Sequence, residues 1–357
     1  MDLTNEDGAG YVGTIFMGSN DAPVKVLFDT GSDFLAITSD LCLDPKLGKQ
    51  EEAKAVYDPV NQIFKNENKD LRKCKSTAYL SQKSTSAHKM GGDDEKLDYG
   101  SAKLMGKLYT DKTCVDANKT ACTNFEFLAL YQAIGLDDTD GVLGLAVHPD
   151  IKRRNLNYVW NLKNNGVIDR AIVSFSIAGP NMDDQSYAIF GGLQPDQIVG
   201  GTEALKKMST TAYRPYWTQS VKQWALEGKS IMYGDELAQK PGGEAAYTAV
   251  IDTGSSNIAI SDDMFKTLVE KWQKDVPKVD CVTDDNFCQV MTPCTEVAPK
   301  LKPISFAIGG QTFEMAPELY LHQAEGKRCQ FAIHSNQLKG TTGNLVLIGD
   351  TLLRHLY

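Results

Sequence analysis

Residues 26–37 read VLFDTGSDFLAI, and residues 249–260 read AVIDTGSSNIAI. Each stretch places one carboxylate, Asp29 or Asp252, after apolar residues, follows it with Thr-Gly-Ser and continues into a second apolar run. A single Asp-Thr-Gly is most simply a β-turn that uses the backbone freedom of glycine, and it arises by chance in roughly one chain in ten of this length. Two copies in matched frames predict an internal repeat, in which two similar halves each build a sheet and contribute one carboxylate.

Two carboxylates that meet can share one proton, because both cannot ionise cheaply within a few ångströms of each other. A water between Asp29 and Asp252 would be activated by the charged group, while the protonated group donates to a carbonyl oxygen. This chemistry favours direct attack of water on an amide, with no acyl-enzyme, no metal and no cofactor.

The residues that follow each aspartate are expected to support the pair: Thr30, Gly31, Ser32, Thr253, Gly254 and Ser255. Glycine lets each turn come close to its counterpart, because it has no Cβ. The threonines can form hydrogen bonds across the two turns, and the serines can hold the outer carboxylate oxygens.

Two other hydrolytic chemistries fit the sequence less well. Glycosidases also use paired carboxylates, but without twin Thr-Gly turns in a fixed frame. A Ser-His-Asp triad needs a committed histidine, and no histidine of this chain lies in a nucleophile-elbow context. The histidines are His88, His148, His322, His334 and His355.

The composition is that of an acidic chain of 357 residues, long enough for one large domain or two of ordinary size. The formal net charge of −9 argues against nucleic acid as a partner, because phosphate would be repelled. No stretch approaches the roughly 18 apolar residues of a membrane span. The first residues lack the basic and apolar regions of a signal peptide, which is consistent with a mature chain whose targeting segment has been removed.

The eight cysteines are even in number, with four in each half of the chain. No C-x-x-C pair occurs and histidine is scarce, so we expect no zinc site. Four disulfides formed in an oxidising compartment are the simpler interpretation. Short spacings suggest the pairs Cys114–Cys122 and Cys281–Cys288, while the pairing of the other four cysteines stays open at this point.

One N-glycosylation sequon, Asn118-Lys119-Thr120, lies inside the first of these short loops. A loop of this kind is expected at the surface, where a secretory protein can carry a glycan. Asn118 is therefore a candidate acceptor, and an unused sequon is the alternative.

Glycine-rich turns and runs of Val, Ile and Thr predict a chain that is mostly β. Residues 10–18 and 23–31 read as two strands across a tight turn, and residues 97–115 read as a projecting hairpin. The polar stretch 43–96 reads as surface loops with short strands. The boundary between the halves is expected shortly after Gly191-Gly192, so we assign residues 1–195 to the first lobe and residues 196–357 to the second.

Few helices are expected. Residues 155–166 have an apolar side and end at Gly166, a typical C-terminal stop. Residues 261–273 begin with Ser261 as the expected N-cap and carry acids in the first turn. Their apolar stripe consists of Met264, Phe265, Leu268 and Trp272.

Taken together, these motifs resemble the pepsin-like aspartic proteases over nearly the whole chain. Asp29 and Asp252 match the two catalytic aspartates of that family. Residues 142–144 and 347–349 match its two apolar-apolar-Gly motifs, each of which crosses beneath one Asp-Thr-Gly turn. The resemblance implies an all-β, bilobal fold, with two pseudo-symmetric β-sheet lobes, few short helices and a central cleft.

The resemblance also assigns residues around the cleft. The hairpin tip with Tyr99, Gly100 and Ser101 matches the flap that covers the substrate. Leu27 and Val142 would line one subsite together with the flap tyrosine, which implies a preference for apolar or aromatic residues beside the scissile bond. The family's disulfide in the second lobe implies the pair Cys294–Cys329, and its first-lobe loop implies Cys42–Cys74.

Two departures from the family bear on function. Ala36 stands where the family commonly has a tryptophan that bonds to the flap tyrosine. The sequence also ends where the family continues for about one further hairpin, so we expect the second lobe to lack the final family strands.

Two hypotheses follow. The first is an aspartic endopeptidase that acts at acidic pH on extended peptides, as a monomer, in the secretory pathway, either outside the cell or in an acidic lysosome- or vacuole-like compartment. The second is a catalytically weak or inactive binding protein on a protease scaffold. The two intact Asp-Thr-Gly-Ser turns favour the first.

Overall fold

Most of the chain is described by the computed structural model. The described residues are 1–5, 10–44, 46–47, 56–58, 63–65, 74–99, 102–136, 139–146, 157–178, 185–210, 224–238, 246–282, 287–324, 326, 328–336 and 344–356. No helix among these residues is long and apolar enough to cross a membrane.

Eleven of the described strands form one sheet, and all of them come from the first half of the chain. They lie in the order β12-β13-β1-β2-β3-β11-β4-β10-β9-β7, with β8 paired to β9. Their bounds are β1 (Asp2–Asn5), β2 (Tyr11–Met17), β3 (Ala22–Asp29), β4 (Leu35–Thr38), β7 (His88–Lys89), β8 (Glu95–Asp98), β9 (Lys103–Cys114), β10 (Cys122–Ile134), β11 (Gly141–Gly144), β12 (Val173–Ser176) and β13 (Ser186–Phe190). A short separate pair, β5 (Val56–Asp58) and β6 (Ile63–Lys65), lies in the polar stretch.

A second sheet of eight described strands comes from the second half. Its main path is β21-β20-β14-β16-β25-β17-β24, with β15 paired to β14. The bounds are β14 (Ala225–Tyr233), β15 (Glu236–Leu237), β16 (Tyr247–Ile251), β17 (Ile258–Ile260), β20 (Ile304–Ile308), β21 (Gln311–Met315), β24 (Ile333–Ser335) and β25 (Asn344–Ile348). A smaller sheet beside it has the order β18-β19-β23-β22, with β18 (Asp280–Val282), β19 (Phe287–Val290), β22 (Leu321–Gln323) and β23 (Cys329–Phe331).

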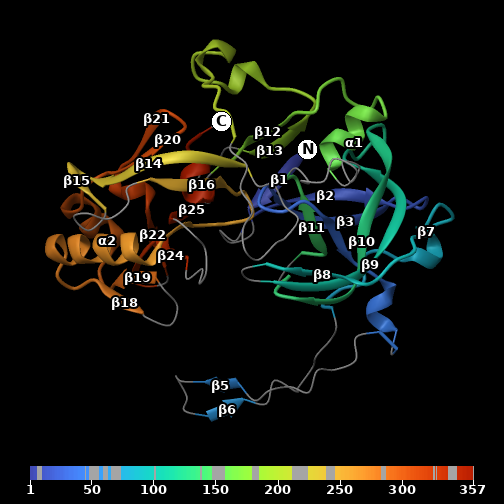
Figure 1. The fold of residues 1–357 in the computed structure, drawn as a ribbon, viewed down its shortest axis with the longest axis horizontal. Coiled ribbons are helices and arrows are strands. Elements are labelled where there is room, and N and C mark those ends of the chain that lie inside the picture. Colours follow the sequence, from blue (N-terminus) through green and yellow to red (C-terminus); the bar gives the residue numbers. More distant parts are fainter. Residues whose placement is uncertain are drawn as a thin grey trace.

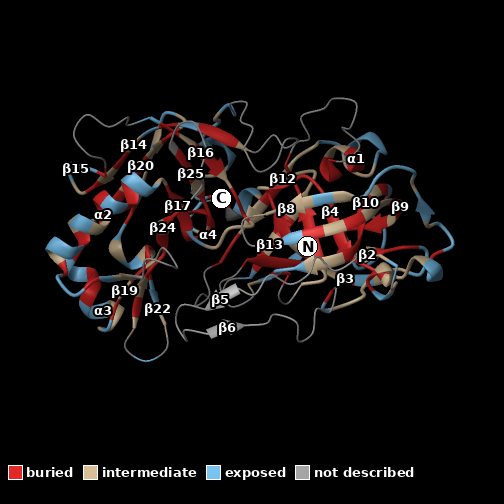
Figure 2. Cartoon of the chain, turned by 60° about the horizontal axis from the view of Figure 1, so that its bottom comes forward, coloured by how far each residue is buried: buried red, intermediate tan, exposed pale blue. Residues whose placement is uncertain are grey.

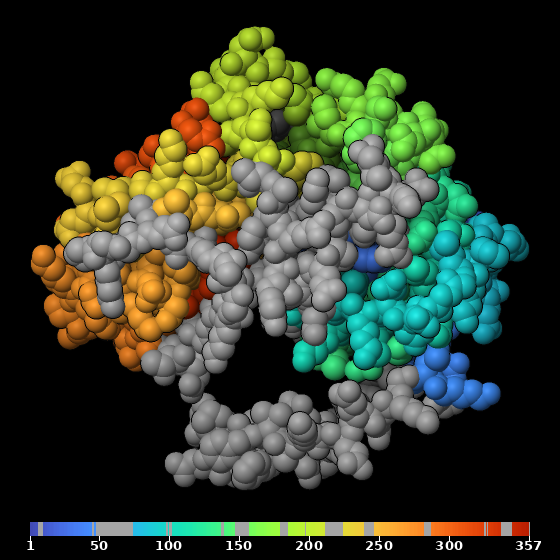
Figure 3. All heavy atoms as spheres, in the orientation of Figure 1, coloured from blue at the N-terminus to red at the C-terminus, as the bar shows by residue number. Residues whose placement is uncertain are grey.

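The two large sheets lie side by side, as Figure 1 shows with β14 and β20 on one side and β9 and β10 on the other. In the space-filling view the two halves of the chain likewise take opposite sides of one face (Figure 3). This architecture confirms the predicted fold class: mostly β, in several sheets, with few short helices. The first sheet ends with β13 and the second begins with β14, while the exact lobe boundary at residues 195/196 stays a prediction.

Alternation of apolar and polar residues explains how the strands bury one face. In β2 and β3 the apolar residues Ile15, Val24 and Val26 are fully buried, and the residues between them are more exposed. Figure 2 shows the buried residues concentrated in the strands, with exposed residues on the outer side of α2. Since all three apolar residues come from the sequence runs that predict strands, the core is readable from the sequence.

The described helices are short except for one. They are α1 (Tyr158–Asn164), α2 (Asp262–Asp275), α3 (Cys294–Val297) and α4 (Asp350–Leu353). The expected apolar stripe of α2 is buried, and the ring of Trp272 lies 4.4 Å from that of Phe331, measured between centroids. Gly166 follows α1 with a φ of 71°, in agreement with a glycine stop.

The expected N-cap of α2 is only half right. Ser261 occupies the N-cap position, but its side chain makes no capping hydrogen bond, and its hydroxyl is buried without a partner among the described residues. Its backbone carbonyl still accepts from the amide of Phe265 at 2.9 Å. In α1, by contrast, the side chain of Asn157 accepts from the amide of Trp160 at 2.9 Å, a cap that the sequence analysis did not predict.

Four disulfides join the cysteines in pairs. The two short loops are closed by Cys114–Cys122 and Cys281–Cys288, and each of these bonds joins directly paired residues of neighbouring strands. The two longer loops are closed by Cys42–Cys74 and Cys294–Cys329. No cysteine remains free.

Candidate active site

Asp29 is the last residue of β3, at the point where β11 lies alongside that strand. Strand β11 runs parallel to β3, with Leu143 opposite Phe28 and Gly144 opposite Asp29, and antiparallel to β4. A Cβ on Gly144 would lie 2.5 Å from the amide nitrogen of Phe34. Only glycine therefore allows β11 to cross so closely beneath the turn.

Asp252 follows β16 in the same arrangement. Strand β25 runs parallel to β16, with Ile348 opposite Ile251, and antiparallel to β17. A Cβ on Gly349 would lie 2.2 Å from the carbonyl oxygen of Ser255. The two apolar-apolar-Gly motifs thus hold the two aspartate turns in matching ways.

The two turns are joined across the halves by their threonines. The amide of Thr30 donates to Oγ1 of Thr253 at 3.1 Å, and the amide of Thr253 donates to Oγ1 of Thr30 at 3.0 Å. Each hydroxyl in turn donates to a carbonyl of the opposite half, Ile251 at 2.8 Å and Phe28 at 2.7 Å. Four hydrogen bonds, three of them buried, therefore fix the two turns against each other.

Each carboxylate is held by its own turn. Oδ1 of Asp29 accepts from the amide of Gly31 at 2.7 Å, and Oδ2 accepts from the hydroxyl of Ser32 at 2.5 Å. Asp252 repeats the pattern: its Oδ1 accepts from the amide of Gly254 at 2.9 Å, and its Oδ2 accepts from the hydroxyl of Ser255 at 2.8 Å. These bonds give both carboxyl groups a fixed orientation.

Each glycine of one turn contacts the carboxylate of the other. A Cβ on Gly31 would lie 2.5 Å from Oδ1 of Asp252, and a Cβ on Gly254 would lie 2.5 Å from Oδ1 of Asp29. The missing side chains are what allow the two carboxyl groups to approach one another.

Burial and mutual repulsion govern the protons of this pair. Asp29 is 7% exposed and Asp252 is 9% exposed. Burial raises the pKa of Asp29 well above its ordinary value, and the nearby charge of Asp252 raises it further, against the lowering effect of the bonds from Ser32 and Gly31. The arrangement therefore favours a pair that keeps one proton and carries one charge.

The hairpin that is predicted to be the flap is formed by β8 and the start of β9. Asp98 pairs with Lys103, and the amide of Tyr99 donates to the carbonyl of Ala102 at 2.7 Å. Gly100 and Ser101, the expected tip, lie outside the described residues.

The hydroxyl of Tyr99 lies close to Ser32 and within reach of the charge of Asp29. Burial raises the pKa of its hydroxyl, and the charge of Asp29 raises it further. The hydroxyl is buried and has no hydrogen-bond partner of normal geometry among the described residues. Because Ala36 has no polar side chain to offer, it does not replace the hydrogen bond that a tryptophan would supply.

The expected subsite residues belong to one apolar cluster, which we call the flap cluster. Leu27 and Tyr99 pack against its buried members. Those members are Ala36, Ala102, Leu104, Leu128, Leu130, Leu136 and Val142. The structure therefore brings the three predicted subsite residues together beside Asp29.

One buried carboxyl near the pair was missed by the sequence analysis. Asp350 is 5% exposed and directly follows the glycine of the second apolar-apolar-Gly motif. The signal that could have found it is an acidic residue one glycine beyond the apolar run 345–348. No group of three or more His, Cys, Asp or Glu side chains in the described part of the chain is placed to hold a metal ion.

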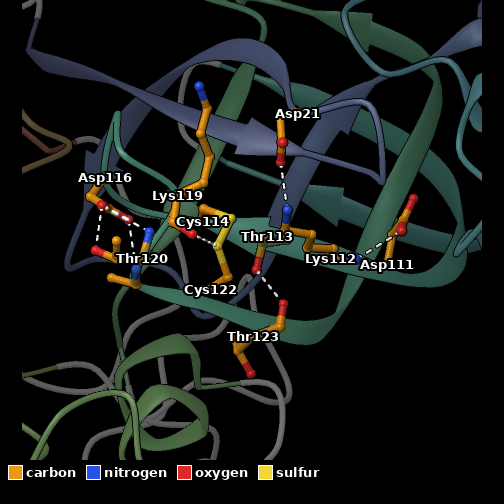
Figure 4. The surroundings of a disulfide bond; sticks show 11 residues. Asp21, Asp111, Lys112, Thr113, Cys114, Asp116, Lys119, Thr120, Cys122 and Thr123 are labelled. Atoms are coloured by element: carbon orange, nitrogen blue, oxygen red, sulfur yellow. Dashed lines mark hydrogen bonds and ion pairs between the residues drawn. A yellow bond between two sulfur atoms is a disulfide. The ribbon is translucent and has the colours of Figure 1, made fainter.

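The sequon lies far from the aspartate pair in the chain and on the surface. Asn118 is exposed, in a turn of the loop that the disulfide Cys114–Cys122 closes. Figure 4 shows Asp116 organising this loop: its carboxylate accepts from the hydroxyl of Thr120 at 2.8 Å. The asparagine side chain is thus presented to solvent.

Comparison with known proteins gives one consistent family. The eukaryotic aspartyl protease family matches residues 10–357. Vacuolar protease A of Neurospora crassa is 24% identical in an alignment of 367 positions. The alignment covers 99% of this chain and 76% of the relative. Pepsin-2B of Gadus morhua is 25% identical over 360 residues (99% and 94%), and vacuolar aspartic protease of Candida albicans is 23% identical over 367 residues (99% and 73%). The similarity extends over nearly the whole chain in each case.

Proposed function

Because the chain belongs to the eukaryotic aspartyl protease family, we propose that it is an aspartic endopeptidase that hydrolyses peptide bonds at acidic pH. The observation that carries this proposal is the reciprocal contact of the two turns, in which the glycine of each meets the carboxylate of the other. Such contact supports a shared proton between Asp29 and Asp252.

In the proposed reaction a water lies between the two carboxyl groups. The ionised group takes a proton from the water as its oxygen attacks the peptide carbonyl carbon, and the neutral group gives its proton to the carbonyl oxygen. The resulting tetrahedral diol then breaks its C–N bond: the carboxyl group that took the water proton gives it to the leaving nitrogen, and the other carboxylate takes a proton from a diol hydroxyl, so the pair again holds one proton. The hydrogen bonds from Ser32 and Ser255 hold the carboxyl groups in place throughout.

The proposed substrate is an extended peptide lying under the flap. Leu27, Val142 and Tyr99 offer an apolar wall beside Asp29, which supports a preference for apolar or aromatic side chains at the scissile bond. The hydroxyl of Tyr99 has no hydrogen-bond partner of normal geometry among the described residues, so it is available to a substrate group, since a buried donor without a partner is costly.

The setting of the enzyme is also part of the proposal. Four disulfides support folding in an oxidising compartment, and two of the relatives are named as vacuolar proteases. We propose a monomer in the secretory pathway, acting outside the cell or in an acidic vacuole-like compartment, with a glycan on Asn118.

A second candidate is a binding protein on a protease scaffold with weak or no turnover. The observation that favours it is Ala36, whose side chain cannot give the flap tyrosine the hydrogen bond that a tryptophan would supply. A flap whose tyrosine lacks that hydrogen bond closes less specifically over a substrate.

One experiment separates the two candidates. The protein is incubated with an unfolded substrate protein from pH 3 to pH 7, with and without pepstatin, and peptide release is measured. We expect cleavage at acidic pH that pepstatin abolishes. Tight pepstatin binding without peptide release would support the binding protein, and cleavage that pepstatin does not affect would contradict the proposed mechanism.

A further inference from the structure

Helix α4 is fastened to the turn that carries Asp252. The amide of Asp350 donates to the carbonyl of Ser255 at 2.8 Å, and the amide of Thr351 donates to the carbonyl of Ser256 at 3.1 Å. The hydroxyl of Thr351 donates to the same carbonyl of Ser256 at 3.0 Å. Any displacement of the first turn of α4 therefore acts directly on the turn of Asp252.

The side chain of Asp350 is buried, and no described residue forms a hydrogen bond with it. Both of its carboxyl oxygens lack a partner among the described residues, and the residue is 5% exposed. A neutral carboxyl in such a place costs little beyond its lost hydrogen bonds, whereas an ionised one without donors is strongly unfavourable.

The internal repeat supplies a comparison within the same molecule. Gly144 and Gly349 are equivalent in the two apolar-apolar-Gly motifs, so the position equivalent to Asp350 in the first half is Leu145. Leu145 is 1% exposed. One half of the fold thus buries a leucine where the other half buries a carboxyl group.

The charged and titratable groups that face Asp350 do not neutralise it. Asp252 and Asp29 raise its pKa, in addition to the larger effect of burial, and Arg354 lowers it. Arg354 forms no hydrogen bond with either carboxyl oxygen of Asp350, and its guanidinium donates instead to the carbonyl of Leu319 at 3.2 Å. Tyr11, on β2, also feels the charge of Asp350, but its hydroxyl donates to another acceptor.

The other side of α4 is apolar and incompletely filled. A cavity of about 340 Å³ is lined by Leu352, Leu353 and Leu356 on one side and reaches Thr30 and Thr253 at the base of the pair. Asp350 is not among the residues that line this mostly apolar cavity, so the cavity gives its carboxyl group no donor, and it leaves space into which the helix can shift.

We propose that Asp350 is a proton-dependent positioning residue, which seats α4 against the Asp252 turn when neutral and unseats it when ionised. In this way it sets the upper pH at which the paired turns stay assembled. The effect on cleavage rests on the proposed function, but the effect on the fold does not, so failure of either is distinguishable.

The test compares wild type with Asp350→Asn, which is nearly isosteric and cannot ionise, and with Asp350→Leu, which copies the equivalent residue of the first half. Thermal unfolding and loss of activity on standing are measured from pH 4 to pH 7.5. At pH 4 the asparagine variant should unfold within a few degrees of wild type. At neutral pH it should unfold about 5 °C higher and lose activity at least about fivefold more slowly.

The matched control is Asp263→Asn, the same change at an exposed carboxylate of α2. This variant should follow the wild-type curve at every pH. The proposal is overturned if Asp350→Asn also follows the wild-type curve. Should both Asp350 variants fail to fold, hydrogen exchange of the wild type decides: protection of α4 and of residues 252–256 must fall as pH rises, and unchanged protection would overturn the proposal.

Discussion

Gly31 and Gly254 are the residues on which the approach of the two carboxyl groups depends. Neither can carry a side chain without displacing the opposite aspartate, because the new Cβ would lie 2.5 Å from a carboxylate oxygen. The aspartates attract attention in the sequence, but the glycines make their pairing possible.

Gly254→Ala should therefore separate the pair. We expect the free energy of unfolding to fall by about 1–3 kcal/mol through overpacking, and peptide cleavage to fall at least about a hundredfold, because a shift of 1 Å in such a site is enough. Gly91→Ala is the control, since a Cβ there meets nothing within 4 Å. Denaturant unfolding and kcat/KM together check the prediction, and an active, stable Gly254→Ala would contradict it.

Ser32→Ala should change the pH dependence more than the rate. The hydroxyl of Ser32 lowers the pKa of Asp29 by bonding to the ionised form, so its loss should raise the upper apparent pKa of the pair by about one unit. The measurement is the pH profile of kcat/KM, whose upper limb should move to higher pH. An unmoved limb would mean that this hydrogen bond does not stabilise the charge.

At this scale the sequence predicts well what is repeated and poorly what is not. Asp29 and Asp252 could be found because two identical motifs point to one chemistry. Asp350 has no counterpart in the first half, where Leu145 takes its place, and its burial depends on packing between distant segments. The missing bond of Tyr99 could be anticipated from Ala36, but the direction of its side chain could not.

The contribution of a disulfide to stability depends on the length of the loop that it closes. Cys281–Cys288 and Cys294–Cys329 both attach to the small four-stranded sheet, but they span 7 and 35 residues. The longer loop loses more entropy on closure, so its bond should contribute about 1 kcal/mol more to stability.

The prediction is that Cys294→Ser with Cys329→Ser lowers the free energy of unfolding more than Cys281→Ser with Cys288→Ser does. Denaturant unfolding of the two double variants under identical conditions measures the difference. Because both pairs lie in the same small sheet, each variant serves as the reference for the other. Equal losses would show that strain or residual structure outweighs loop length.

Element boundaries follow from the sequence where side-chain pattern alone decides them. Helix α2 lies within three residues of its expected bounds, because its apolar stripe and first-turn acids agree. The predicted capping hydrogen bond of Ser261 is not formed: its hydroxyl is buried and does not accept from the amides of the first turn. Local preference for a cap is worth only about 1 kcal/mol, which tertiary packing readily outweighs.

The whole molecule is expected to be an acid-stable fold. Asp29 and Asp350 both have pKa values raised above the ordinary 3.8. The folded state therefore binds more protons than the unfolded state above that pH, and stability is lost as pH rises through the folded values. The net charge of −9 at neutral pH adds repulsion in the same direction.

Thermal unfolding of the wild-type protein should show this directly. We expect the unfolding midpoint to be highest near pH 4 and to fall steadily toward neutral pH. The fall should be larger than repulsion between surface charges explains. Repeating the series at high salt separates the two causes, because salt screens exposed charges much more than buried ones. A midpoint that rises from pH 4 to pH 7 would contradict the raised pKa values of Asp29 and Asp350.

The bilobal architecture could be predicted because the repeat implies two similar halves, and the two large sheets fall on either side of the middle of the chain. The bonds between the halves could be anticipated only in part. The threonines were expected to meet, but the bond from the indole of Trp224 to the carbonyl of Leu145, at 3.3 Å, has no sequence signal. Contacts of this kind depend on how two finished lobes come together.

The central claim is that Asp29 and Asp252 form one site that shares a proton. The most direct measurement is hydrolysis of an unfolded protein at acidic pH by Asp29→Asn and by Asp252→Asn, with thermal unfolding of each variant to verify its fold. We predict that either change alone lowers the rate of cleavage at least about a thousandfold. The double variant should cleave no more slowly than the single variants. Substantial cleavage by either folded single variant would contradict the claim.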